Sequence, residues 1–169
     1  MSDLKITITD QTLHWVRSFI IKYNLCPFAK GSVNKGRLRI QVYLDKKQAK
    51  ALEALMDEVF FLDNNTEIET TLLVLGNGFN DFFTYLNFVD KAEELMKEQG
   101  YEGVYQLATF HPDYCFADTD IDDVSNYTNR SPYPMLHLLR EDMLEKAIAA
   151  YGDTSKIPEH NIATLKKIL

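Results

Sequence analysis

Two histidines and one glutamate in the second half of the chain have the side chains needed for acid–base chemistry. His111 follows a β-rich segment, and His137 and Glu141 stand four residues apart after a segment with several prolines. Imidazole titrates near neutral pH, so histidine is the most common general acid or base, and a neighbouring carboxylate can orient its ring. We expect His111 or His137 to be the general acid or base and Glu141 to orient it.

The same three residues also form a possible set of metal ligands. Two imidazoles and one carboxylate suit iron or zinc with open coordination positions. The four-residue spacing of His137 and Glu141 is compatible with ligands on one face of a helix, but it is common and not diagnostic. The sequence predicts no cofactor, and a divalent metal held by His111, His137 and Glu141 is the alternative, because a tightly bound ligand cannot also shuttle protons freely.

Arg130 and Arg140 predict that the site binds an anion. A guanidinium group holds a carboxylate or phosphate through two parallel N–H bonds. Pro134 favours the start of a helix at that position, and the free amides of a first helical turn also attract anions. Asn129 would add an amide hydrogen bond. An alternative stays open, in which the charged residues of this helix form a structural ion-pair network.

Cys26 and Lys30 place a thiol beside a basic side chain at the end of a helical segment. A nearby histidine could convert such a thiol into a nucleophilic thiolate, although a helix C-terminus raises the pKa of a thiol. We therefore expect Cys26 either to contact the ligand or to be a buried structural residue. Residues 22–50 carry eight basic residues and one acidic residue, which could draw an anionic substrate toward Lys30.

Composition limits the class of protein. A chain of 169 residues with 46% hydrophobic residues fits one domain, 1–169, with a substantial core. Its net charge of −7 is a poor match to a phosphate backbone, so we expect no nucleic-acid partner. No secretory signal is visible, and the aliphatic run 72–75 is far shorter than the roughly 18 residues of a membrane span. We expect a cytoplasmic protein with no membrane partner, and the oligomeric state stays open.

The spacing of apolar residues predicts the elements that hold the site. Helical spacing predicts five helices, and alternating or continuously apolar β-rich segments predict three strands. The expected helices cover residues 10–23, 46–62, 80–99, 134–151 and 157–169. The expected strands cover residues 37–44, 70–75 and 104–110. This alternation predicts an α/β or α+β fold, in which a small, mostly parallel sheet of at least three strands is flanked by about five helices.

Residues 111–133 show neither a helical nor a strand period. Long irregular segments in compact domains are usually functional or disordered, and the aromatic residues, Asn and Pro of this segment favour an ordered loop. The segment follows a predicted strand, and open α/β sheets bind their ligands at the carboxyl ends of strands. We therefore expect the site to lie here. The helix predicted over 134–151 would place His137 and Glu141 on one face.

Several motifs resemble a bacterial family, the domain of unknown function 1415. These motifs are Leu25-Cys26-Pro27-Phe28-Ala29, Glu69-Thr70-Thr71-Leu72-Leu73, Phe110-His111-Pro112, the block from Asn126 to Glu141, and Ile157-Pro158-Glu159 with Asn161-Ile162. The resemblance spans nearly the whole chain and implies no particular activity. It does imply that nine residues belong to one recurring arrangement. These are Cys26, Glu69, His111, Asn129, Arg130, His137, Arg140, Glu141 and Asn161.

The candidate residues together predict a cytoplasmic enzyme that acts on a small anionic metabolite. In this hypothesis Arg130 and Arg140 hold the anion, and the histidines and Glu141 perform the proton transfer. One alternative is a metal-dependent enzyme. Another is a non-enzymatic module that binds a small molecule or recruits a partner protein. A partner module would expose a large apolar patch, for which the aromatic candidates are Phe116, Tyr127 and Tyr133.

Overall fold

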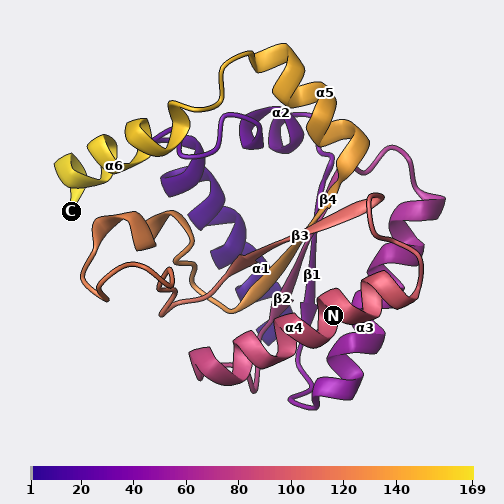
Figure 1. The fold of residues 1–169 in the computed structure, drawn as a ribbon. Coiled ribbons are helices and arrows are strands. Elements are labelled where there is room, and N and C mark those ends of the chain that lie inside the picture. Colours follow the sequence, from indigo (N-terminus) through magenta and orange to yellow (C-terminus); the bar gives the residue numbers. More distant parts are fainter. Residues whose placement is uncertain (1) are drawn as a thin grey trace.

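Residues 2–169 are described by a computed structural model, in which a four-stranded sheet carries helices on both faces (Figure 1). The strands are β1 (Leu38–Tyr43), β2 (Thr70–Leu75), β3 (Tyr105–Phe110) and β4 (Met135–Arg140). Their order is β1-β2-β4-β3. β1 and β2 are parallel, whereas β4 is antiparallel to both of its neighbours. The fold is therefore mixed α/β, and the prediction of a mostly parallel sheet is wrong because an antiparallel strand separates β2 from β3.

Six α-helices occur within residues 2–169, together with one π-helix and one 3₁₀-helix. In chain order they are α1 (Asp3–Trp15), the π-helix η1 (Val16–Ile21), α2 (Ala29–Asn34), α3 (Gln48–Asn64), α4 (Phe82–Glu98), the 3₁₀-helix η2 (Val124–Thr128), α5 (Glu141–Tyr151) and α6 (Ile157–Ile168). Among these residues no helix has the length and apolar character needed to span a bilayer. α2 is an addition to the five predicted helices, because its six residues are too few to show a helical period.

The first helix begins earlier than the sequence predicts. It starts at Asp3 because the hydroxyl of Ser2 accepts a hydrogen bond from the backbone N–H of Lys5 at 3.4 Å. The β-branched residues of the segment 6–9 hide this turn, since such residues favour strands.

The two faces of the sheet bury alternate residues of each strand. Leu73 on β2 and Leu136 on β4 pack in the core beneath α3 and α4, and each such leucine contributes roughly 1.5–3 kcal/mol relative to an exposed position. Leu72 and Met135, one position away on each strand, face the opposite side, where α1 and η1 pack. Figure 1 shows α3 and α4 on one side of the sheet and the other four helices on the other side.

The segment 134–151 contains a strand followed by a helix, so the prediction of one long helix is wrong. β4 ends at Arg140, and α5 begins at Glu141, whose N–H donates to the carbonyl of Val104 at 3.0 Å. The run 135–139 is apolar apart from His137, and both faces of β4 carry apolar residues that are buried or half-buried, so this run carries no period that separates strand from helix. The amides expected to open a helix instead pair within the sheet, and no anion site of that kind forms there.

The segment 111–133 contains one regular element, η2, and hydrogen bonds order the rest of it. The amide of the buried Asn126 accepts from the N–H of Phe116 and the hydroxyl of Thr119, both at 2.9 Å, and donates to the carbonyl of Asp120 at 2.9 Å. Aromatic contacts then join this loop to α4.

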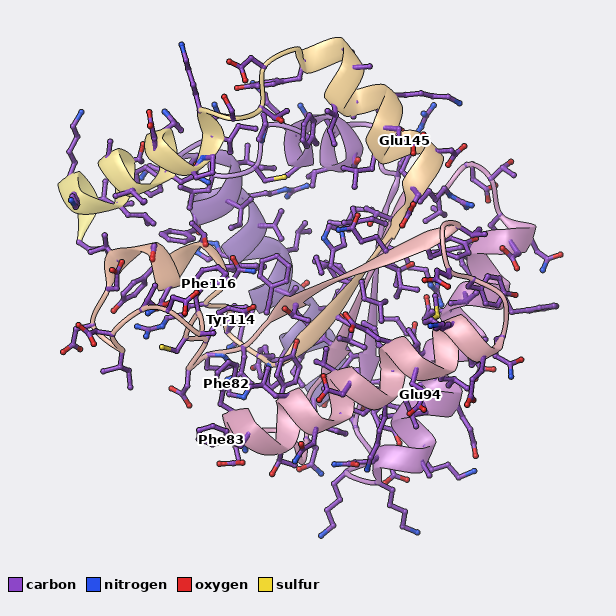
Figure 2. All side chains as sticks on the ribbon, viewed as in Figure 1. Phe82, Phe83, Glu94, Tyr114, Phe116 and Glu145 are labelled. Carbon is purple, nitrogen blue, oxygen red and sulfur yellow. The ribbon has the colours of Figure 1, made fainter. Side chains whose placement is uncertain are left out.

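These aromatic contacts run from the start of α4 into the loop. The rings of Phe82 and Tyr114 have centroids 5.4 Å apart, and those of Tyr114 and Phe116 lie 5.0 Å apart edge to face (Figure 2). Such geometries stabilise aromatic pairs beyond their buried area. The long irregular segment is therefore held in place on the rest of the fold.

Candidate ligand pocket

A cavity of about 660 Å³ lies between the sheet and helices η1, α2, α5 and α6. Most of its wall is apolar. The apolar lining residues include Trp15, Val16, Ile20, Leu25, Phe28, Leu38, Leu72, Phe110, Leu139, Met143, Leu144, Ile157 and Ile162. Clefts of this size with a few polar groups among apolar side chains are typical of small-molecule sites. The cavity is therefore the candidate functional site.

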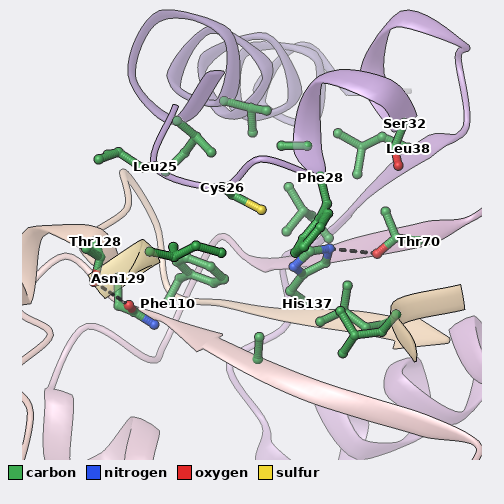
Figure 3. A pocket seen from close by; sticks show the side chains of 18 of the residues that line it. Leu25, Cys26, Phe28, Ser32, Leu38, Thr70, Phe110, Thr128, Asn129 and His137 are labelled. Carbon is green, nitrogen blue, oxygen red and sulfur yellow. Dashed lines mark hydrogen bonds between the residues drawn. The ribbon is translucent and has the colours of Figure 1, made fainter. Parts of the chain in front are cut away.

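The floor of the cavity is formed by residues that are neighbours across three strands. His137 on β4 pairs with Leu72 on β2 and with Ala108 on β3, and all three residues line the cavity. The sheet register thus places one imidazole among apolar side chains. Figure 3 shows its ring at the base of the pocket.

Thr70 determines which nitrogen of His137 carries the proton. The hydroxyl of Thr70 lies 2.5 Å from the carbonyl oxygen of Leu138 and 2.6 Å from Nε2 of His137. A carbonyl cannot donate, so the single hydroxyl proton must go to Leu138, and Nε2 of His137 must donate to the hydroxyl. The proton of the neutral ring therefore lies on Nε2. The other nitrogen, Nδ1, points into the pocket (Figure 3) and carries a lone pair.

Burial keeps this imidazole neutral. It lowers the pKa of His137 to about 4, because the low-dielectric surroundings disfavour the charged ring. At pH 7 the ring can therefore accept a hydrogen bond at Nδ1 but offers no positive charge to an anion. The same nitrogen could act as a general base toward a bound molecule.

Of Cys26 and Lys30, only Cys26 lines this pocket. Cys26 is half-buried in the turn between η1 and α2, its thiol is free, and its sulfur points into the same pocket as the His137 ring (Figure 3). Lys30 is exposed on α2 and is not among the lining residues. Only Cys26 of this pair is placed to contact a ligand.

Asn161 on α6 contributes to the wall of the cavity. Its Nδ2 donates to the carbonyl of Leu25 at 2.9 Å, while its Oδ1 is buried and has no hydrogen-bond partner in the described part of the chain. The residue is 7% exposed and lines the cavity. Reasoning from single residues missed this role, although an asparagine on the apolar face that also carries Leu165 was the available signal.

Glu69 forms a charged cluster at the pocket wall, next to Thr70. Its carboxylate accepts from the hydroxyl of Ser32 at 2.6 Å and from the guanidinium of Arg37 at 2.9 Å. Partial burial by itself would raise the pKa of Glu69, but these two hydrogen bonds together outweigh it, and the pKa lies below its ordinary value. The carboxylate is ionised at pH 7 and its charge is already paired.

Asn129, for which a ligand contact is predicted, lines the pocket. Its Nδ2 donates to the carbonyl of Thr109 at 2.9 Å, and its Oδ1 accepts from the hydroxyl of Thr128 at 2.7 Å. The side chain therefore joins the long loop to β3 at the pocket wall.

The two candidate arginines donate to backbone carbonyls. Arg140 belongs to the lining set, but its guanidinium donates to Leu62, Asn65 and Ile68 at 2.6 to 3.1 Å, around the C-terminal end of α3. These bonds add a side-chain donor to carbonyl groups around the end of the helix, where backbone donors are fewer.

Arg130 plays a similar part in the long loop. Its guanidinium donates to the carbonyls of Tyr114 and Ile121 at 3.0 and 2.6 Å and lies over the ring of Tyr127 at 4.6 Å. It does not line the cavity. Both arginines thus hold backbone in place, and an anion would have to compete with these carbonyls.

His111 lies on the other side of the sheet, away from the pocket. The ring is fully buried and lies 5.1 Å from the ring of Phe82 and 5.0 Å from that of Tyr85. Its Nδ1 accepts from the N–H of Asp113 at 3.0 Å, so its Nε2 must donate to the carbonyl of Phe79 at 3.0 Å. Burial lowers the pKa of His111. Both ring nitrogens are thus used within the protein.

The structure does not bring together the three residues of the predicted metal set. His111 and His137 lie on opposite sides of the sheet, and Glu141 opens α5 outside the lining set. Within residues 2–169 no group of three or more His, Cys, Asp or Glu side chains is arranged to hold a metal ion. Glu141 also does not share a helix face with His137, because β4 ends between them.

The family model described as "Protein of unknown function (DUF1415)" matches residues 7–169, nearly the whole chain. The chain belongs to this family. Neither a curated protein nor a solved structure matches it. Of the residues that the DUF1415 resemblance groups together, the larger part lines the pocket. These lining residues are Cys26, Glu69, Asn129, His137, Arg140 and Asn161.

Proposed function

We propose that the protein binds a small, predominantly apolar molecule in the cavity between the sheet and helices α2, α5 and α6. The observation that carries the proposal is an apolar cavity of about 660 Å³ into which His137 presents a free Nδ1. Removing apolar surface from water contributes roughly 25 cal/mol per Å² to affinity before the costs of association. A single polar anchor on the floor would then orient the ligand.

The prediction of a small anionic metabolite stays a prediction. For that ligand, the guanidinium groups of Arg130 and Arg140 would have to leave their backbone carbonyls. The neutral ring of His137 adds no attraction for a negative charge. The geometry therefore favours an apolar ligand over an anion.

An enzyme acting on an apolar substrate is the second candidate. Thr70 holds the Nε2–H form of His137, so Nδ1 could remove a proton from a bound molecule, with the thiol of Cys26 on the same pocket. The low pKa makes the ring a weak base, which favours substrates with an acidic proton.

We also propose a reducing, cytoplasmic location, which the free thiols of Cys26 and Cys115 support.

A recruiting role for the loop aromatics has less support than the pocket. Tyr127 lies under Arg130, the hydroxyl of Tyr133 donates to Gln11, and Phe116 packs against a neighbouring ring. These three rings are engaged with other side chains and do not form one free apolar patch.

Fluorescence titration with N-phenyl-1-naphthylamine, a neutral apolar probe, tests the proposal. The wild-type protein should enhance the emission of the probe in a saturable way. Ala147→Trp should abolish this binding, because Ala147 lines the cavity and an indole would fill it. Ala149→Trp is the matched control, since Ala149 is exposed on the same helix. No saturable binding by the wild type, or equal binding by both variants, would refute the proposal.

A further inference from the structure

We infer that the polar group of the ligand is an uncharged hydrogen-bond donor, a hydroxyl or an N–H, that donates to Nδ1 of His137. The inference rests on the proposed binding function and adds the chemical class of the ligand. It follows from an imbalance in the pocket, where the donor groups of several lining residues are engaged within the protein and one acceptor, Nδ1 of His137, is open.

Several donor groups around the pocket already have protein partners. The hydroxyl of Thr70 and the amide groups of Asn129 and Asn161 each donate to a backbone carbonyl, at 2.5, 2.9 and 2.9 Å. The hydroxyl of Ser32 donates to the carboxylate of Glu69 at 2.6 Å. A ligand acceptor, such as a ketone or an ether, would therefore have to compete with bonds that the protein makes.

One acceptor that faces the pocket is left without such a partner. Nδ1 of His137 points into the pocket with its lone pair, because Thr70 fixes the ring proton on Nε2. Oδ1 of Asn161 also has no partner in residues 2–169, but it is buried within the wall formed by α6 and does not face the cavity. A buried acceptor without a donor is unfavourable, so a ligand that supplies one gains affinity.

The charges around the pocket favour an uncharged donor. The apolar walls disfavour any unpaired charge. An anion would meet the neutral ring of His137 and the ionised carboxylate of Glu69, neither of which attracts it. An ammonium group would find Glu69 already paired with Arg37 at 2.9 Å. A neutral hydroxyl or N–H donates to Nδ1 without placing an unpaired charge among apolar side chains.

A set of naphthalene probes of nearly equal size tests this inference by calorimetric or fluorescence titration of the full chain at pH 7. The set is 2-naphthol, 2-methoxynaphthalene, 2-naphthoate and 2-naphthylmethylamine. The hydroxyl probe should bind about five- to tenfold more tightly than its methyl ether, the value of one neutral hydrogen bond. It should also bind more tightly than the carboxylate and the ammonium probes. In His137→Phe the ratio of naphthol to ether affinity should fall to about 1.

The outcomes separate this inference from the proposed function. Equal binding of 2-naphthol and 2-methoxynaphthalene would overturn the donor inference and leave the apolar pocket standing. Tightest binding of the naphthoate or of the ammonium probe would overturn it in favour of a charged ligand. Failure of all four probes to bind would overturn the proposed function itself. The comparison of probes uses the wild-type protein, so it holds even where His137→Phe does not fold.

Discussion

The two faces of the sheet use the same strands in different ways. Beneath α3 and α4, buried side chains such as Leu73, Phe88 and Leu136 form one continuous core. On the opposite face the buried residues form two smaller clusters, and the cavity lies beside them. The packed face stabilises the fold, whereas the other face leaves a space that a ligand can fill.

His111, which is fully buried, and His137, which is half-buried at the cavity, show what distinguishes these faces chemically. His111 and His137 both have a pKa lowered by burial. Both ring nitrogens of His111 form hydrogen bonds with backbone groups. In His137 one nitrogen is hydrogen-bonded to Thr70, and the other faces the cavity. The candidate site is therefore distinguished by a polar atom without a hydrogen-bond partner in the protein, and not by the residue type alone.

The largest expected effect comes from truncating neighbouring leucines of β4 that point to opposite faces. Leu136→Ala should lower the free energy of unfolding by about 2–5 kcal/mol, because it opens a void in a filled core. Leu139→Ala should cost less than about 1.5 kcal/mol, since Leu139 already borders the cavity. Urea denaturation with an unchanged m-value measures both. Equal losses would show that the two faces do not differ in packing.

The next effect is the pH dependence of stability. Burial holds the pKa of His137 below the ordinary 6.5, so the unfolded chain binds the proton more tightly. The stabilisation from the neutral ring is complete above pH 6.5 and is lost as the pH falls toward 4. It amounts to at most about 3 kcal/mol, and to less where pocket water reaches the ring.

Replacing each histidine in turn separates the two faces in this experiment. His137→Phe and His111→Phe should both reduce the loss of stability below pH 6.5, measured by denaturation at several pH values. Only His137→Phe should change the binding of 2-naphthol. A loss of probe selectivity in His111→Phe as well would place both rings in one functional unit.

A smaller effect is expected from Arg140. Arg140→Met should cost about 2 kcal/mol, because it removes the side-chain donor from three backbone carbonyls, of which those of Leu62 and Asn65 keep a backbone N–H donor. Arg37→Met is the control, since its exposed ion pair with Glu69 should contribute less than about 1 kcal/mol. Thermal and urea denaturation measure both. An Arg140→Met protein of unchanged stability would instead restore the anion-binding prediction.

The smallest effect concerns the charged cluster at the pocket wall. Ser32→Ala should cost roughly 0.5–1.5 kcal/mol by removing one hydrogen bond to Glu69. The pKa of Glu69 should rise, which carbon-detected NMR titration can follow. Because the folded pKa lies below the ordinary value, the stabilisation by Glu69 is present at neutral pH and is lost as the solution is acidified through that pKa. An unchanged titration would show that Ser32 does not hold the carboxylate.

The sequence predicts three of the strands well and misses the fourth. The segments 37–44, 70–75 and 104–110 contain alternating or β-branched runs, and β1, β2 and β3 occupy them with ends shifted by at most one residue. The fourth strand lies within 134–151, where both faces of the segment 135–140 are covered and its residues are buried or half-buried. A strand covered on both sides loses the alternation that would reveal it.

The site is only partly predictable for a related reason. The sequence shows that His137 and Cys26 can do chemistry, and the structure places both on one cavity. The partner of each polar atom is set by long-range register. Thr70 reaches His137 across the antiparallel pair of β2 and β4, and Arg140 reaches carbonyls of the segment 62–68. The spacing of residues along the chain does not show which side-chain donors are already hydrogen-bonded to other parts of the protein.

The π-helix η1 has a consequence for the wall of the pocket that follows it. Its backbone bonds join residues five apart, as in the N–H of Leu25 donating to Ile20 at 2.9 Å. A turn of this kind holds about one residue more than an ordinary α-helical turn. Deleting one residue within η1 would therefore restore α-helical winding and leave Cys26 and Phe28 close to their present orientation. Deleting one residue within α1 would instead turn everything that follows by about 100°.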